Sequence, residues 1–430
     1  MNIGIWGHYH GGNLGDDVVV GLIIDNLRSR IPDACLYGFS MKPADTAIRH
    51  GIPSYPIFYG LKKPCLPTHQ VVRSAAASPP QEQPRWPAKM WLRAIKVLRT
   101  VKRSIGKPVM LYRMWKSARL MDTIIVAGSQ VLLDEWSIWA HPYTLFKWAL
   151  LCKIGHTRLI LLSIGAGPLT HPLARFFAKV SLNFSTYSSF RDLSSVAVVE
   201  TLGIRTPQSV FPDLAFAVDG AAVQTERGHR GSRARPIVGI STMAHNDPRY
   251  WPKADSRKYH AYLDTIAGFA SWLIGRGYDV SLIKSQTIVD ARVAEQLSGI
   301  LESPDAEVVR HRLQNPDTLA VRELMLQIAQ CQIVVGARFH CHVLPLVLGI
   351  PVLGIAYHPK TTDLMQYMGL ADYSLAIADV TLQRLIEYFL RIERHRKQLS
   401  ADSLARAAEC RSRVMKQFDN VCHTLTTTHQ

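Results

Sequence analysis

Short apolar runs of strand length alternate with helical segments along most of this chain, and they do so in two separate series. The first series begins with "NIGIW" at residues 2–6, followed by a glycine-rich loop, a helical segment at residues 18–30 and a second strand, "ACLYGFS". This order is that of a βαβ unit, which builds parallel sheets. Further strands at residues 123–128 and 158–167 predict a doubly wound parallel sheet in this half.

A stretch rich in Gly and Arg, residues 225–236, interrupts the alternation, and a second series then begins. Its expected strands are residues 237–242, 279–284, 307–311, 332–337 and 351–357. We therefore predict an α/β fold with two Rossmann-like domains that face each other across a cleft.

The expected boundaries follow from these two series. The N-terminal Rossmann-like domain spans residues 1–225 and carries a basic insertion at about residues 60–120. The C-terminal Rossmann-like domain spans residues 236–380. A charged helical segment, residues 381–430, follows it and could pack back across both domains.

Positive charge is concentrated in one stretch of the chain. The formal net charge is +17, and between Arg85 and Arg119 there are eleven Lys or Arg residues and no Asp or Glu. Within this stretch "AKMWLRAIKVLRTVKRSI" has the spacing of a basic amphipathic helix with a tryptophan. Three interpretations stay open, namely packing on the parent domain, contact with an anionic membrane surface, and contact with nucleic acid. No aromatic-basic RNA motif or zinc finger supports nucleic acid, so we expect none as a partner.

Neither a metal site nor a disulfide framework is indicated by the seven cysteines, which form no C-x-x-C pair. No basic segment with an apolar core precedes the first strand, so we expect no signal peptide. The most apolar window, Val343 to Tyr357, is short and is broken by prolines and glycines, so we do not expect it to span a bilayer. These features predict a cytoplasmic protein, either soluble or peripheral on the inner face of the cytoplasmic membrane, with no metal and no cofactor.

The glycine-rich loop after the first strand fits neither a dinucleotide fingerprint nor a P-loop, because His10 replaces the first required glycine and Asn13-Leu14 replaces the Lys-Ser/Thr pair. What remains is Asn13, Gly15, Asp16 and Asp17 at the start of a helix. Capping accounts for one of the aspartates. A second acid that faces the cleft could orient or deprotonate a hydroxyl.

Three ionisable residues follow two consecutive strands in "VVGARFHCHVLPLVLGIPVLGIAYHPK". Arg338 and His340 follow the strand "QIVVGA", and Lys360 follows "PVLGIAY"; between them "CHVLPLVLG" predicts a helix with Pro345 in its first turn. The carboxyl ends of adjacent parallel strands share the edge where α/β sheets bind ligands. Arg338 could instead pair with an acid and His340 could cap a helix, but an Arg, a His and a Lys at one edge favour a site for a small, doubly charged anion.

Several segments together resemble the polysaccharide pyruvyl transferase family. They are "NLGDD", "GSQVLLDE", "SIGAGPL", "FRDLSS", "VFPDLAFAV", "GARFHCHVLPLVLGIPVLGIAYHPK" and "MGLADY". The resemblance covers most of residues 1–55 and 120–375. Two positions depart from the family pattern, because Gly128-Ser129-Gln130 stands where three glycines are common and His358 stands where an Asp precedes Pro-Lys.

The resemblance implies a GT-B-like fold, a donor-binding second domain and phosphoenolpyruvate as donor. It matches Arg338, His340 and Lys360 to the family's R-x-H and Lys, Arg191 with Asp192 to its Arg-Asp pair, and Asn13 to Asp16 to its N-L-G-D element. The implied product is a pyruvate ketal on a sugar of a polysaccharide or lipid-linked oligosaccharide, with release of phosphate.

We assign roles on chemical grounds. His340 is the expected general acid, because an imidazole titrates near neutral pH, and Asp16 is expected to take a proton from the acceptor hydroxyl. Arg338, Lys360 and Arg191 are expected to bind the anionic donor, with Asn13 and Gly15 as further substrate contacts.

Two alternatives stay open at this point. One is a GT-B-type glycosyltransferase that uses a nucleotide sugar. The other is a non-enzymatic protein that binds a membrane or a polyanion through residues 85–119.

Overall fold

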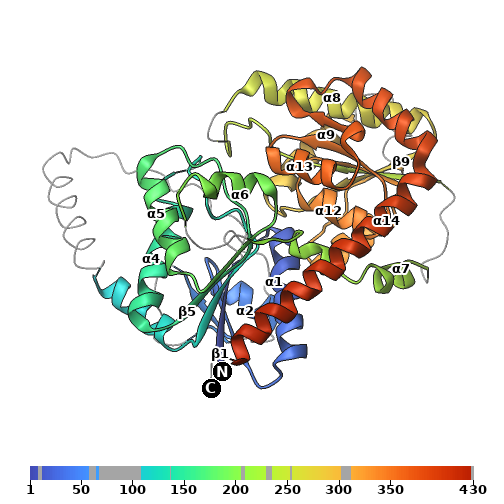
Figure 1. The fold of residues 1–430 in the computed structure, drawn as a ribbon. Coiled ribbons are helices and arrows are strands. Elements are labelled where there is room, and N and C mark those ends of the chain that lie inside the picture. Colours follow the sequence, from blue (N-terminus) through green and yellow to red (C-terminus); the bar gives the residue numbers. More distant parts are fainter. Residues whose placement is uncertain are drawn as a thin grey trace, which may run out of the picture.

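The computed structural model describes residues 1–7, 12–57, 64–66, 108–135, 137–204, 209–228, 235–251, 254–301 and 311–427. Within these ranges the chain forms two wholly parallel β-sheets, one in each half, and helices lie on their faces (Figure 1). The expected α/β fold with two Rossmann-like units is confirmed.

The first sheet has the strand order β3-β2-β1-β4-β5-β6-β7. Its strands are β1 (Asn2–Trp6), β2 (Cys35–Ser40), β3 (Ser54–Pro56), β4 (Thr123–Ala127), β5 (Arg158–Ile164), β6 (Tyr187–Phe190) and β7 (Ser209–Val210). Its helices are α1 (Leu14–Arg30), α2 (Pro43–His50), α4 (His141–Gly155), α5 (Pro172–Phe184) and α6 (Leu193–Glu200), and the 3-10 helix η1 (Leu214–Ala217) follows. Residues 108–119 are also helical.

The second sheet has the order β10-β9-β8-β11-β12-β13. Its strands are β8 (Ile237–Ser241), β9 (Asp279–Ile283), β10 (Leu313–Gln314), β11 (Ile333–Gly336), β12 (Val352–Ala356) and β13 (Ser374–Ala376). The helices of this half are α7 (Gly220–Gly228), α8 (Ser256–Gly275), α9 (Val289–Leu301), α11 (Val321–Ala329), α12 (His340–Val347), α13 (Pro359–Tyr367) and α14 (Leu382–Thr427). Each sheet reverses its strand order once, between β1 and β4 and between β8 and β11, and such switch points are where α/β sheets bind ligands.

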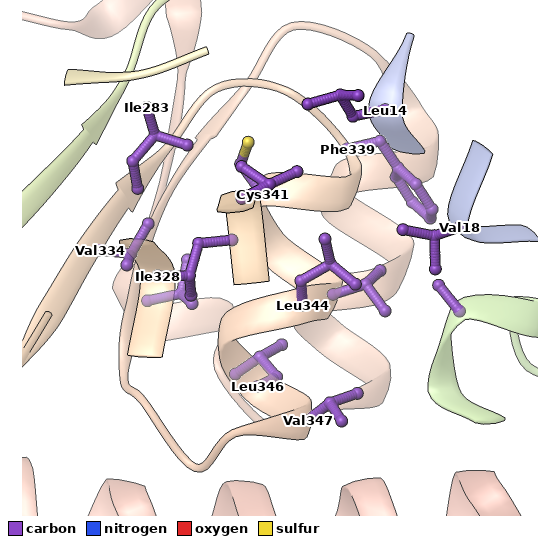
Figure 2. Close-up of a cluster of buried hydrophobic side chains, with 14 of the residues drawn as sticks. Leu14, Val18, Ile283, Ile328, Val334, Phe339, Cys341, Leu344, Leu346 and Val347 are labelled. Carbon is purple, nitrogen blue, oxygen red and sulfur yellow. The ribbon is translucent and has the colours of Figure 1, made fainter. Parts of the chain in front are cut away.

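Apolar side chains join the two halves. One buried cluster includes Leu14 and Val18 of α1 together with Phe339 and Leu344 from the second half (Figure 2). A separate cluster lies on the other face of the first sheet, under α4 and α5. The first sheet therefore turns one face toward the second half and the other face away from it.

Helix α14 crosses both halves (Figure 1). It packs against α1 and η1 of the first half and against α8 and α12 of the second. Near its end the fully buried Gln417 accepts a hydrogen bond from Ser163 Oγ at 3.0 Å and donates one to Ser189 Oγ at 2.7 Å. The helix is thus fixed to β5 and β6 by buried polar contacts as well as by apolar ones.

Local details differ from the sequence expectations at two places. Helix α1 begins at Leu14, and its cap is Asn13 rather than an aspartate, because Asn13 Oδ1 accepts the amide hydrogen of Gly15 at 3.2 Å. Pro345 lies inside α12 and not in its first turn, because the helical backbone already begins at Phe339. Only the last residue of the expected strand at residues 307–311 is described. The basic amphipathic segment at residues 88–105 lies outside the described residues.

Replacing Gln417 with Leu should lower the free energy of unfolding by about 1–3 kcal/mol, because Ser163 and Ser189 would keep buried hydroxyl groups without this partner. Urea unfolding measures the effect. Gln398, which is exposed on the same helix, provides the control, since Gln398→Leu should change stability by no more than about 0.5 kcal/mol. Equal stability of the two variants would show that the Gln417 contacts contribute nothing net.

Candidate active site

The residues singled out in the sequence lie at the carboxyl ends of strands from both sheets. Asn13 and Asp16 follow β1, and Gln130 follows β4. Arg338 and His340 follow β11, which pairs directly with β12, and Lys360 follows β12. Both switch points therefore contribute side chains to one region between the sheets.

Main-chain hydrogen bonds hold the two halves together at this region. The amide of Leu14 donates to the carbonyl of Ser285 at 2.8 Å, and the amide of Thr287 donates to the carbonyl of Gly12 at 2.8 Å. Gly12 has a φ of +89°, and a Cβ on it would lie 2.4 Å from Thr287 Oγ1. The start of α1 is thus paired with the loop after β9, and we call this contact the domain seam.

Gly15 leaves room for the ring of His340 at the seam. A Cβ on Gly15 would lie 2.0 Å from Nδ1 and 2.5 Å from Cγ of His340. Any side chain there would overlap the imidazole. Within the same turn Asn13 Nδ2 donates to Asp16 Oδ2 at 2.8 Å, which fixes the Asp16 carboxylate beside the seam.

His340 is buried, and its Nε2 has no hydrogen-bond partner among the described residues. The nearest carboxylate is that of Asp213, with Oδ1 at 3.9 Å from Nε2. Burial lowers the pKa of His340 and outweighs the opposing effects of Asp213 and Asp16, while Arg191 and Lys360 add to the lowering. The imidazole is therefore neutral near pH 7 until further negative charge arrives.

Arg338 forms a buried ion pair. Its Nε lies 3.1 Å from Oδ1 of Asp290, and its Nη2 bonds the same oxygen. Asp290 is fully buried and also accepts the amide hydrogen of Gln286, in the loop that pairs with Gly12 and Leu14. Burial raises the pKa of Asp290, and Arg338 opposes this. Arg338 therefore holds the loop of the domain seam in place, and Asp290 offsets much of its charge.

Lys360 and Arg191 meet from opposite sheets at the side chain of Gln130. Oε1 of Gln130 accepts a hydrogen bond from Lys360 Nζ at 3.1 Å and one from Arg191 Nη2 at 3.4 Å. Gln130 Nε2 donates to the carbonyl of Gly167 at 2.8 Å, which fixes the orientation of the amide. A neutral oxygen therefore lies where two cations converge, as the oxygen of a bound anion would.

The two cations differ in how far their charge is already compensated. Arg191 lies 3.4 Å from Asp213 and 3.6 Å from Asp192, and its side chain is only 4% exposed. Lys360 has no carboxylate within ion-pair distance among the described side chains. Both cations lie over the ring of Phe339, at 4.8 and 5.5 Å from its centre. Lys360 is thus the cation with most capacity for a new anionic partner.

The two departures from the family pattern touch each other. Gln130 Nε2 and His358 Nε2 are 3.2 Å apart, and His358 Nδ1 faces the amide of Lys360 at 3.3 Å. Both ring nitrogens thus face N–H donors, although a neutral imidazole accepts at only one. The pKa of His358 is lowered to about 4 by burial and then by Lys360 and Arg191. An Asp at this position would add a negative charge next to Lys360, so the Gln130–His358 pair leaves that cation without an acid.

Several residues of this region were not singled out by the sequence. Asp213 lies in "VFPDLAFAV", which contributed to the family resemblance, but nothing in the sequence assigned it a role. Gln130 stood out only because it departs from the family pattern. Asp290 lies in the first turn of α9, and no sequence motif indicated that it would belong to the site. Tyr357 directly precedes the loop that carries Lys360. Burial raises its pKa, but Lys360 and Arg338 together outweigh this effect, so the pKa is lowered. The neighbour Asp17 faces α2 instead, at 3.7 Å from Arg49.

No group of three or more His, Cys, Asp or Glu side chains is placed to hold a metal ion in the described part of the chain. Among the described helices, none is long and apolar enough to cross a membrane.

Residues 13–359 match the family model described as polysaccharide pyruvyl transferase. The chain belongs to this family. It is also 24% identical, over 86% of its length and 87% of the relative's, to the amylovoran biosynthesis protein AmsJ of Erwinia amylovora. The expected membership is confirmed, and a pyruvyl transferase of polysaccharide biosynthesis is an enzyme, so the non-enzymatic alternative is set aside.

Solved structures share the fold at low identity. The Anabaena protein Alr3699/HepE, solved with UDP, is 14% identical with a TM-score of 0.53 and covers 99% of this chain and 100% of its own. The Staphylococcus aureus MnaA–UDP structure is 9% identical with a TM-score of 0.56 and covers 95% of this chain and 91% of its own. These similarities confirm the expected GT-B-like arrangement of the pyruvyl transferase.

Gly15→Ala should lower activity by about a hundredfold, because the new methyl group would displace His340, the expected general acid, and small displacements of a catalytic group cost about this much. Phosphate release from the donor measures the loss. Gly21 lies in the same helix, and a Cβ added to it would meet nothing within 4 Å, so Gly21→Ala should keep activity and add about 0.5–1 kcal/mol of stability. Full activity in Gly15→Ala would show that the close approach of His340 is dispensable.

Proposed function

We propose that this pyruvyl transferase uses phosphoenolpyruvate as donor and forms a pyruvate ketal on two hydroxyls of a sugar, with release of phosphate. The acceptor is a sugar of a polysaccharide or of a lipid-linked oligosaccharide. The supporting observation is the convergence of Lys360 and Arg191 on the oxygen of Gln130 beside His340. Cations from both sheets at one buried point suit a small ligand with a phosphate and a carboxylate.

The donor anions replace the contact with Gln130 in this proposal. Lys360 binds one anionic group as a point charge, and Arg191 binds the other with its planar fork. Arg338 contributes a smaller share, because Asp290 already holds Nε and Nη2. Nη1 of Arg338 makes no hydrogen bond among the described residues and remains for the ligand.

Proton transfer begins at His340. The imidazolium donates a proton to the methylene carbon of the enol phosphate, which becomes a methyl group and leaves cationic character at the neighbouring carbon. A first acceptor hydroxyl adds to that carbon, and Asp16 takes its proton. The C–O bond to phosphate then breaks, and the second hydroxyl adds in its place.

The proposed reaction balances without any further reactant. Two protons leave the acceptor hydroxyls. One of them restores the proton that His340 gave to the methyl group, and the other leaves with the phosphate. Asn13 holds Asp16 in place, and Gly15 lets the ring of His340 lie against the start of α1, in the same turn as Asp16.

The partners of the basic segment also remain a proposal. Residues 85–107 lie outside the described residues. We propose that residues 85–119 contact the anionic inner face of the cytoplasmic membrane, where a lipid-linked acceptor would be presented.

Incubation of the protein with phosphoenolpyruvate and candidate lipid-linked glycans should release phosphate and add the mass of a ketal to the glycan. Phosphoenolpyruvate should raise the unfolding temperature, whereas nucleotide sugars should not.

Lys360→Ala should weaken donor binding by about tenfold or more, because a hydrogen bond to a charged group is lost. Lys397→Ala, at an exposed position of α14, should have no effect. Stabilisation by a nucleotide sugar alone would favour a glycosyltransferase instead.

Donor binding should be coupled to protonation of His340. Burial keeps the pKa of His340 below its ordinary value, and a bound anion raises it, so binding takes up a proton and strengthens as the pH falls through the raised pKa of the complex. Titrations of the wild type and of His340→Asn separate this effect from the ionisation of the donor phosphate itself. His340→Asn should bind the donor without the extra pH dependence and should lose turnover. Normal turnover in this variant would remove His340 from the acid role.

A further inference from the structure

Three helices cover the face of the first sheet that is turned away from the second half. They are α4, α5 and residues 108–119, and their inner sides carry Met114, Trp148 and Ala178 of the second buried cluster. The end of α4 touches the third helix, since a Cβ on Gly155 would lie 3.7 Å from Cβ of Arg119. We call the solvent-exposed side of these helices the outer helical face (Figure 1).

Large apolar side chains are exposed on the outer helical face. Tyr112, Trp139, Ile154 and Phe176 are 59%, 58%, 57% and 52% exposed. Ring contacts join two of them, Trp139 and Phe176, across α4 and α5. The ring centre of Tyr143 lies 5.2 Å from that of Trp139 and 5.3 Å from that of Phe177, and the ring centres of Phe177 and Phe176 are 6.0 Å apart. A grouped set of exposed aromatic and aliphatic side chains indicates an interaction surface.

Positive charge predominates on the same face, and two acids lie at its edge, namely the exposed Glu135 and Asp134, which accepts the amide hydrogen of His171 at the start of α5. Residues 137–191 contain six Lys or Arg and no Asp or Glu, and residues 108–121 contain three Lys or Arg and no acid. The exposed cations among them are Arg113, Lys116, Arg119, Lys153 and Lys179. Cations interleaved with Trp and Tyr are typical of protein surfaces that lie in the headgroup region of a bilayer.

We propose that the outer helical face docks on an anionic phospholipid bilayer. A second copy of the chain is a poor occupant, because a two-fold contact would place the cations of one copy against those of the other. A nucleic acid would match the charge but offers nothing for the exposed apolar side chains. A bilayer with anionic headgroups matches both features, because the cations meet phosphate groups while the apolar side chains enter the acyl boundary.

This surface shares residues 108–119 with the basic segment named in the sequence and extends over α4 and α5, whose inner sides pack in the second buried cluster. It lies on the opposite face of the sheet from α1 and the domain seam. Docking at this surface would bring the enzyme to a lipid-linked acceptor. Only this purpose of the docking rests on the proposed function.

Flotation with phospholipid vesicles tests the proposal on the full chain, without donor or acceptor. The protein should bind vesicles of phosphatidylcholine with phosphatidylglycerol, and binding should weaken with salt and be absent for phosphatidylcholine alone. Lys116→Glu combined with Lys153→Glu should lower the partition coefficient by about thirtyfold or more, given the attraction of each cation to an anionic surface. Ile154→Ser combined with Phe176→Ser should lower it by about tenfold or more.

Matched controls lie elsewhere on the surface. Arg394→Glu with Lys397→Glu on α14 makes the same change of net charge, and Ile288→Ser with Ile300→Ser removes two other exposed isoleucines. Neither control should change vesicle binding, and phosphate release with a water-soluble acceptor should persist in all four variants. The proposal is overturned if the wild type ignores anionic vesicles, or if test and control variants lose binding equally. It is also overturned if heparin binds as well as vesicles and the apolar variant has no effect, which would indicate a polyanion site.

Discussion

The close approach of the start of α1 to the second half is the constraint on which the rest of the site depends. Gly12 and Gly15 carry no Cβ, and this lets the loop after β9 and the ring of His340 lie directly against the α1 backbone. Main-chain bonds at Leu14 and Thr287 then fix the register of the two halves. Because buried main-chain groups need partners, this seam is specific in a way that apolar packing alone would not be.

The cations around that seam differ in how far nearby acids compensate their charge. Arg338 is paired with the buried Asp290 and supports the loop, so removing either partner would leave an uncompensated buried charge. Arg191 is partly compensated by acids of its own half, whereas Lys360 has no carboxylate within ion-pair distance in the described part of the chain. The neutral Gln130 amide joins these two cations. This arrangement leaves positive charge at the proposed donor site.

The resemblance to solved structures and the family membership answer different questions. Proteins that share the fold at 14% identity or less include structures solved with UDP, so the fold by itself does not select a donor. We propose that the side chains at the carboxyl edges select it. Gln130 and His358, the two departures from the pattern that the resemblance implies, contact each other, and each adjusts the surroundings of Lys360 without adding charge.

The sequence by itself determined the order of strands and helices, the two halves and the family. Strand-length apolar runs and helical periodicity are local patterns, and the carboxyl-end positions of Arg338, His340 and Lys360 follow from them. The tertiary structure alone decided which charges remain available. Asp290 reaches Arg338 across 48 positions, and Gln130 reaches Lys360 across 230. Likewise only the packing of α1 buries His340 against Gly15. Such contacts depend on how distant segments meet in space, and no local pattern in a single sequence records that.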